Sequence, residues 1–299
     1  MLPMLSDSVR IVAVVISMSY LRSNNLPFTL VSCISKENAN VKAPVIVALS
    51  LLTFSAAYAD QWNKHWTVSG KPELHVTSGD ASVIVEPGAG GSIDATLTTQ
   101  GWSIGDSGVR VTEHQNGNRV EIDVKVPPSN FTFGNHSIKL EVHVPQDLIA
   151  DVHTGDGSVR LRELHGSIRA DTGDGSIQAD RMDGILDAHS GDGSVHVSGR
   201  FDNLRLHTQD GSVTLDVFSG SKLSADWRVE TGDGSVTLHL PKTLSANLEL
   251  HTGDGHIRLD LPLTATGTQN EHRMEGKLNA GGPLFMVRTG DGSITVGPS

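Results

Sequence analysis

The chain has 299 residues, a formal net charge of −11, 32 glycines, 12 prolines and only 4% aromatic residues. Scarce aromatic residues and abundant glycine argue against a deep globular core of large side chains and favour many short strands joined by tight turns. The acidic balance excludes a nucleic-acid-binding protein, because the neutralisation of phosphates requires a clustered basic face and the lysines and arginines here are scattered.

The first 59 residues differ in composition from the rest of the chain. Lys42 precedes the apolar run APVIVALSLLTFS, and the small-x-small pattern AYA follows at residues 57–59. This order is typical of a secretory signal peptide, with cleavage before Asp60. The run is shorter than the about 20 residues that a stable membrane-spanning helix needs. We therefore assign residues 41–59 as a signal peptide and expect export to the periplasm, the cell envelope or the extracellular space, with no stable membrane span after cleavage.

A signal peptide that begins at Val41 leaves residues 1–40 unexplained. If the codon of Val41 is a bacterial GTG start, residues 1–40 are an over-extended gene start, that is, an untranslated lead. The alternative is an authentic extension with an apolar segment at residues 11–18 or a lipoprotein-like LVSC sequence ending at Cys33. Cys33 is the single cysteine, so the cleaved chain would have no thiol for disulfides, thiolate catalysis or metal binding.

Residues 60–150 carry a fainter strand pattern. The segment ELHVTSGDASVIV at 73–85 and the segments RVEIDVKVP and SIKLEVHVP alternate apolar and polar residues with the period of a strand. We expect irregular first coils of an adhesin-like domain here. Three tryptophans should cap or fill this end, because an open sheet edge invites aggregation. They are Trp62, Trp66 and Trp102.

A recurring TGDGS motif dominates residues 151–299, and its aspartates follow one another at intervals of 18, 18, 18, 23, 21 and 37 residues. Each unit of about 18 residues contains two short alternating stretches and two turns, so it cannot bury its apolar face without stacked neighbours. The last interval approaches two units, which predicts a degraded motif within residues 269–283. The motif aspartates are Asp156, Asp174, Asp192, Asp210, Asp233, Asp254 and Asp291.

The repeat predicts an all-β fold, a parallel β-solenoid in which residues one repeat apart lie above each other. An antiparallel meander or β-sandwich is the alternative. The solenoid is favoured because stacking explains why equivalent positions carry similar side chains, and the extra residues of the longer units can loop out at the opposite corner. One inward column of β-branched residues comprises Val159, Ile177, Val195, Val213, Val236, Ile257 and Ile294.

The TGDGS motif also invites comparison with a phosphate-binding loop, but such a loop requires a following lysine and a helix, and here a β-branched strand follows. We interpret the motif as a turn in which both glycines adopt positive φ and the aspartate carboxylate accepts backbone amides. Calcium binding by the aspartate column is the alternative. Calcium β-rolls repeat an aspartate every nine residues, whereas His165 follows Asp156 at that spacing.

Four histidines share one outward repeat position, and two of them, His189 and His207, should lie on adjacent rungs, near enough to share a transition-metal ion. A solvated polar column is the simpler interpretation, so we assign no metal-ligating, cofactor-binding or catalytic residue. The strand faces lack a clustered carboxylate pair, and the sequence contains neither a nucleophile elbow nor HExxH, so we expect a protein that is not an enzyme. The four histidines are His153, His189, His207 and His251.

With its secretory signal, faintly patterned first part and recurring TGDGSV or TGDGSI, the chain resembles the bacterial "putative adhesin" domain of unknown function over residues 68–299. That family is similar to auto-transporter adhesin heads, and the resemblance implies a β-solenoid of the envelope or cell surface without catalytic residues. We therefore expect a secreted, non-enzymatic solenoid that presents a polar surface to a protein or glycan partner. The alternatives are a periplasmic scaffold or envelope-stress accessory, and a polysaccharide-active enzyme.

Overall fold

The structure is a computed structural model that describes residues 59–127 and 136–299. The expected over-extended start (1–40) and the expected signal peptide (41–59), except for Ala59, lie outside the described residues. Within those residues, no helix is long and apolar enough to cross a membrane. The strands are β1 (Ala59–Thr67), β2 (Glu73–Ser78), β3 (Ser82–Pro87), β4 (Ser92–Gln100), β5 (Arg110–Asn116), β6 (Arg119–Lys125), β7 (Ser137–Val144), β8 (Asp147–Thr154), β9 (Val159–Arg162), β10 (His165–Thr172), β11 (Ile177–Ser190), β12 (Val195–Thr208), β13 (Val213–Val217), β14 (Trp227–Thr231), β15 (Val236–Leu240), β16 (Ala246–Thr252), β17 (Ile257–Leu259), β18 (Thr264–Gln269), β19 (Arg273–Leu278), β20 (Leu284–Thr289) and β21 (Ile294–Pro298).

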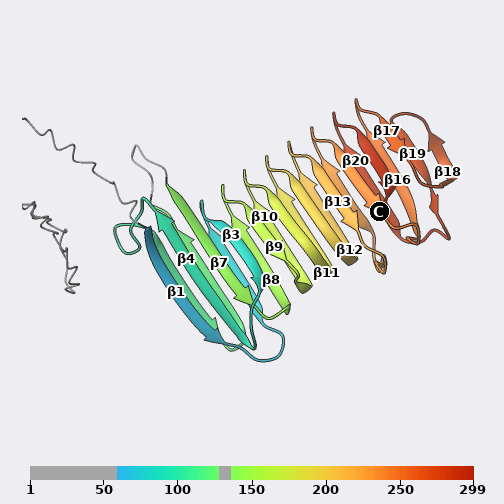
Figure 1. The fold of residues 1–299 in the computed structure, drawn as a ribbon. Helices are drawn as coiled ribbons and strands as arrows, with labels where there is room; N and C mark the ends of the chain where they lie inside the picture. The colour runs from blue at the N-terminus through green and yellow to red at the C-terminus, as the bar shows by residue number, and fades with distance from the viewer. Residues whose placement is uncertain (1–58, 128–135) are drawn as a thin grey trace, which may run out of the picture. The chain divides into compact units, whose positions relative to one another are not determined.

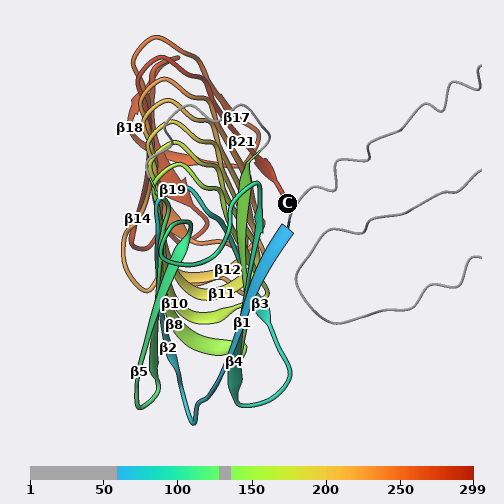
Figure 2. The same ribbon diagram turned by 90° about the vertical axis from the view of Figure 1, so that its left-hand side faces the viewer.

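The coils stack side by side, as Figure 1 shows, and their strands form two faces joined by the TGDG corners. The pre-corner sheet contains the strand that leads into each corner, and the post-corner sheet contains the strand that leaves it. β11 and β12 bend at the opposite corner and run through both sheets (Figure 2). Neighbouring coils pair in parallel through the middle of the stack, so the predicted all-β parallel solenoid is confirmed.

The interior is a set of aligned apolar columns. Val159 pairs with Ile177, which pairs with Val195, and every member of the predicted β-branched column is buried. Because side chains alternate across a strand, the polar residues between these positions face outward. Three aromatic rings widen the core near the longer units: Phe201 and Trp227 meet edge to face with centroids 6.3 Å apart, and Trp227 and Phe285 do so at 5.4 Å. The extra residues at 218–226 and 241–245 lie at the corner opposite the TGDG motif, as predicted.

The order of coils in space departs from their order in sequence at both ends. The coil β2–β3 lies between the coils β6–β7 and β8–β9. At the other end the last coil, β20–β21, lies between β14–β15 and β16–β17, pairing in parallel with both. The expectation of a degraded coil at 269–283 is therefore wrong. This segment instead forms much of an antiparallel hairpin, β18 with β19, from which the chain returns into the open slot.

Antiparallel strands close both ends of the stack. β4 pairs antiparallel with β7 and is itself covered by β1, β5 pairs with β6, and β19 pairs with β16. Trp66 on β1 is buried, while Trp62 and Trp102 are half-buried against the core, as expected of residues that cap this end. The antiparallel strands oppose the direction of the coils, so further coils cannot add to the stack by the same repeat.

Candidate functional site: the corner ridge and the pocket at its end

Each corner is organised by the hydroxyl of the residue two positions before its aspartate, including the corner at Asp210, where Gln209 replaces the first glycine. Thr208 is fully buried; its Oγ1 donates to the carbonyl of Gly193 in the coil before (2.9 Å) and accepts from the amide of Gly211 (3.3 Å). The hydroxyl thus joins two consecutive coils and fixes the turn. The same hydroxyl position is occupied, along the stack, by Ser78, Thr154, Thr172, Ser190, Thr208, Thr231, Thr289 and Thr252, all of them buried.

The motif glycines are required by close packing between coils and not, as expected, by positive φ. None of them is among the glycines with positive φ in the described chain. A Cβ on Gly175 would lie 2.1 Å from the carbonyl oxygen of Gly157, and a Cβ on Gly193 would lie 2.0 Å from that of Gly175. Only glycine allows backbones to approach so closely. Positive φ occurs at the opposite corner instead, at Gly166 and at Glu163 (φ 52).

The motif aspartates do not form the Asx-turns that the sequence suggested. Their carboxylates make no side-chain hydrogen bond or ion pair with any described residue, because the buried hydroxyl already accepts the corner amide. All of them are exposed, at strand spacings of about 4.8 Å. We call this row the corner ridge; in spatial order it comprises Asp80, Asp156, Asp174, Asp192, Asp210, Asp233, Asp291 and Asp254.

The histidine position forms an outward row on the pre-corner sheet. His189 and His207 are adjacent, as predicted, with stacked rings 4.7 Å apart. Burial lowers the pKa of His207, the nearby His189 lowers it further, and Glu230 opposes both. Among the described residues, no group of three or more His, Cys, Asp or Glu side chains is placed to hold a metal ion. In spatial order the row is Asp123, Thr77, His153, Asp171, His189, His207, Glu230, Arg288, His251 and Arg273.

Ion pairs connect neighbouring outward positions on both faces. Arg169 Nε donates to Asp171 at 2.7 Å, which raises the pKa of the guanidinium. At the first end of the post-corner sheet, the hydrogen bond with His65 lowers the pKa of Asp94. Because each pair lies at the surface with an exposed cationic partner, Arg169 or His65, such pairs contribute little to stability, and their main effect is a mixed-charge surface.

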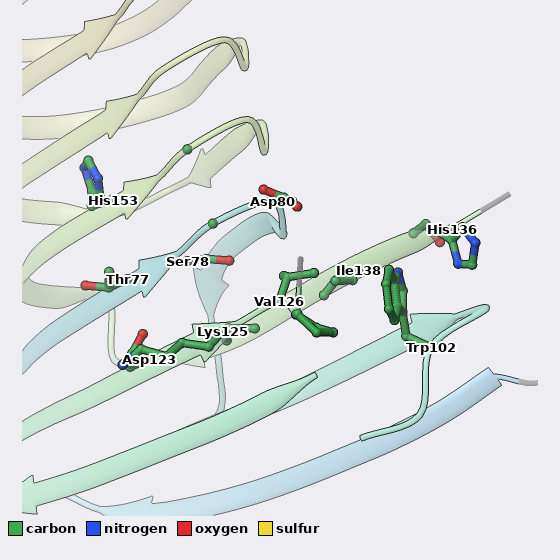
Figure 3. A pocket seen from close by; sticks show the side chains of 15 residues that line it. Thr77, Ser78, Asp80, Trp102, Asp123, Lys125, Val126, His136, Ile138 and His153 are labelled. Carbon is green, nitrogen blue, oxygen red and sulfur yellow. The ribbon is translucent and has the colours of Figure 1, made fainter. Parts of the chain in front are cut away.

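A pocket of about 1160 Å³ lies at the end of the corner ridge where Asp80 stands. Figure 3 shows Ser78 and Asp80 on one side of the opening and Trp102, Ile138 and His136 on the other. The rings of Trp102 and His136 lie 5.0 Å apart and tilted. Thr99 holds the backbone of Trp102 in place, because the Oγ1 of Thr99 donates to the carbonyl of Trp102 at 2.7 Å. The polar lining includes Thr77, Asp123, Lys125 and His153.

The pocket was not predicted from the sequence. It lies where β6 ends at Lys125 and β7 begins at Ser137, beside the described corner that carries Asp80. The signal that could have revealed it is the pair of alternating segments RVEIDVKVP and SIKLEVHVP, which flank a link without a TGDG motif. Trp102 was expected at this end, but as a cap and not as part of a pocket wall.

These features define a class of protein, a parallel β-solenoid with hydroxyl-and-glycine corners that carry an exposed acidic ridge. Residues 72–297 match the family model Toastrack DUF4097, and the chain belongs to that family. No curated protein matches the chain.

Three solved structures are similar to this chain at low identity. The first is a putative cell adhesion protein from Clostridium sporogenes, with 12% identity and a TM-score of 0.37; the match covers 80% of this chain and 100% of that chain. The second is a putative adhesin from Bacteroides fragilis, with 11% identity and a TM-score of 0.39; the match covers 79% of this chain and 96% of that chain. The third is a putative lipid binding protein from Parabacteroides distasonis, with 14% identity and a TM-score of 0.38; the match covers 80% of this chain and 98% of that chain. Similarity at this level does not assign a function.

Proposed function

We propose that this protein is an exported, non-enzymatic β-solenoid whose corner ridge and outward faces bind a partner at the cell envelope or cell surface. The observation that carries the proposal is the ridge itself. Eight carboxylates lie in one exposed row and take no part in the hydrogen bonds that hold the corners together. Their placement is therefore not explained by folding, and a row of free carboxylates can bind hydroxyl or cationic groups of a partner.

The arrangement of these carboxylates supports binding better than catalysis. Enzymes that cleave glycosides place two carboxylates on opposite sides of one bond, whereas the ridge presents single carboxylates side by side along an exposed edge. Export is supported by the signal-like segment at residues 41–59.

Fractionation of the native host, followed by N-terminal sequencing, tests the export half of the proposal. We expect the protein in the envelope or medium, beginning at Asp60. Protease treatment of intact cells then distinguishes surface display, in which the protein is digested, from a periplasmic scaffold, in which it is protected. A protein recovered from the cytoplasm with residues 1–59 intact would overturn the proposal.

The binding half is tested by charge removal on the ridge. A variant with Asp174→Asn, Asp192→Asn and Asp210→Asn should keep the fold, because these carboxylates make no contact that stabilises the corners. We expect weaker attachment of the purified protein to envelope preparations of the host and its neighbours. The matched control changes three exposed charges outside the ridge. Equal attachment of wild type, ridge variant and control would contradict a binding role for the ridge.

A further inference from the structure

A groove crosses the post-corner sheet near the corner opposite the TGDG motif. It consists of two adjoining hollows of about 790 and 460 Å³, and both are lined by Asp180, Ser198 and Asp216. Consecutive coils contribute one outward residue each, because Ser198 pairs with Asp216 and Asp216 pairs with His239. We call Asp180, Ser198, Asp216 and His239 the groove row. Its members follow one another at the strand spacing of about 4.8 Å.

A β-bulge places Asp180 at one end of this row. The pairing of β11 with β12 shifts between Ala179 and Met182, so Asp180 and Arg181 both lie opposite Ser198. Arg181 adopts positive φ (52°), and its amide donates to Ser198 Oγ at 3.1 Å. The serine hydroxyl accepts in this bond and keeps its proton for another acceptor. Bulges redirect side chains and are frequent beside binding sites.

The groove row presents acceptors that the fold leaves open. Because a carboxylate only accepts, the contact between His239 Nδ1 and Asp216 Oδ1 places the proton on Nδ1 and makes Nε2 of the neutral ring an acceptor. Asp180 Oδ2 accepts from Gln178 Nε2 at 2.8 Å. Among the described residues, the second oxygen of each carboxylate has no hydrogen-bond or ion-pair partner. The row therefore offers acceptors at three positions and a hydroxyl donor at Ser198.

Phe218 gives the groove an apolar surface. Its side chain is 40% exposed and lines the same hollow as Asp216 and His239. The backbone of Phe218 is held on both sides, because its amide donates to the carbonyl of Gly199 at 2.7 Å and its carbonyl accepts from Ser221 Oγ at 2.8 Å. An exposed ring on a fixed backbone is suited to pack against the C–H face of a sugar.

The charge and pairing of the groove limit the class of ligand. Asp180 and Asp216 disfavour an acidic ligand, and Arg181, which lines the same hollow, is paired with Glu163. A peptide cannot add as a strand, because β13 is already paired on both edges, with β12 and with β15. Hexoses in an extended β-1,4-linked chain advance by a length similar to the strand spacing of about 4.8 Å, so successive sugars can meet successive coils.

We propose that this groove binds a neutral, extended β-1,4-linked glycan that lies along the stack. One sugar packs its C–H face on Phe218. Hydroxyls of this sugar and its neighbours donate to Asp180, Asp216 and His239 Nε2, while Ser198 donates to a sugar oxygen. The inference deepens the proposed function, on which it rests, since it names a glycan as the partner and places it on the post-corner sheet.

Titration of the isotope-labelled protein with two tetrasaccharides tests the inference by NMR. The probes are cellotetraose and maltotetraose, which have the same composition and differ in the configuration of their linkages. We expect cellotetraose to shift the amide resonances of Phe218 and of the groove row. Maltotetraose should bind about tenfold more weakly, because its curved chain forms fewer hydrogen bonds with the row at one time.

Two pairs of variants provide the controls. Phe218→Ala should weaken the binding of cellotetraose about tenfold, while Ile185→Ala, at an exposed apolar residue of the pre-corner sheet, should leave the affinity unchanged. Asp216→Asn should also weaken binding, while Asp187→Asn, at an outward carboxylate of the pre-corner sheet, should not. Absence of cellotetraose binding, equal affinity for both probes, or shifts confined to other residues would overturn the inference.

Envelope attachment separates this inference from the proposed function. If the ridge variant loses attachment but cellotetraose does not bind, the groove inference fails while the proposed function stands. If wild type, ridge variant and control attach equally while cellotetraose shifts the groove row, the binding role of the ridge fails and the groove inference stands.

Discussion

Replacement of Gly193 by alanine tests the claim that close packing between coils selects the motif glycines. The added Cβ would lie 2.0 Å from the carbonyl oxygen of Gly175, 2.4 Å from its carbonyl carbon and 2.7 Å from the amide nitrogen of Ser176. All three are backbone atoms, so no side-chain rotation relieves the overlap. The two coils must separate locally by about 1 Å to reach ordinary contact distances.

The separation has two costs. Overpacking of a well-packed interior typically costs about 1–3 kcal/mol. The amides of Gly191 and Asp192 donate to the carbonyl of Gly173 at 2.7 and 3.1 Å, and weakening both bonds costs about 1 kcal/mol each. The expected loss is therefore about 3–5 kcal/mol, which for a folded unit of this size lowers the melting temperature by about 6–20 °C.

Thermal and urea unfolding followed by far-UV circular dichroism measures this loss. Asp192→Asn, one residue earlier and exposed, is the matched control and should stay within about 0.5 kcal/mol of wild type. If Gly193→Ala were as stable as Asp192→Asn, the close approach of the two backbones would not explain why glycine occupies position 193. A large loss in Asp192→Asn would instead mean that the carboxylate stabilises the corner.

Three further predictions follow from the corner, the histidine row and the order of the coils. Thr208→Val should lower the free energy of unfolding, measured in urea, by about 2–4 kcal/mol, because the buried carbonyl of Gly193 and the amide of Gly211 lose their hydrogen-bond partner. Thr208→Ser keeps the hydroxyl and should retain most of the wild-type stability. The folded-state pKa of His207 is lowered, so the unfolded chain takes up its proton first, and stability falls as the pH drops through about 6.5. His207→Gln should make the melting temperature less dependent on pH between 8 and 5.5. An unchanged pH dependence would refute the attribution of this loss of stability to His207. Deletion of residues 283–299 should lower the melting temperature by about 10 °C or more, since it removes the coil paired with both its neighbours, and only a slight change would contradict the inserted position.

Much of the fold could be predicted from the sequence because solenoid stacking makes local pattern and tertiary position coincide. Val159, Ile177 and Val195 recur at the repeat length, and a parallel stack places such residues in one column, where they were found. His189 and His207 were expected on adjacent rungs for the same reason and are stacked there.

The roles within the motif could not be predicted in the same way. A glycine selected for positive φ and a glycine selected by a neighbouring carbonyl look alike in sequence, and only the position of the next coil distinguishes them. Likewise, Thr208 and Asp210 both offer an acceptor for a corner amide. The threonine forms the bond because its side chain points inward to the buried amide, whereas the aspartate points to solvent.

The sequence by itself determined the strand period, the corner positions, the inward columns and the outward polar rows, because each depends on residues within one repeat or on residues one repeat apart. The tertiary structure alone decided which coils are neighbours at the two ends. The slot filled by β20–β21 and the pocket beside Gly79 depend on pairings between segments far apart in the chain, and the repeat pattern is the same whichever compatible coil lies alongside. The local pattern therefore fixes what each coil can pair with, and packing of the whole stack selects the partner.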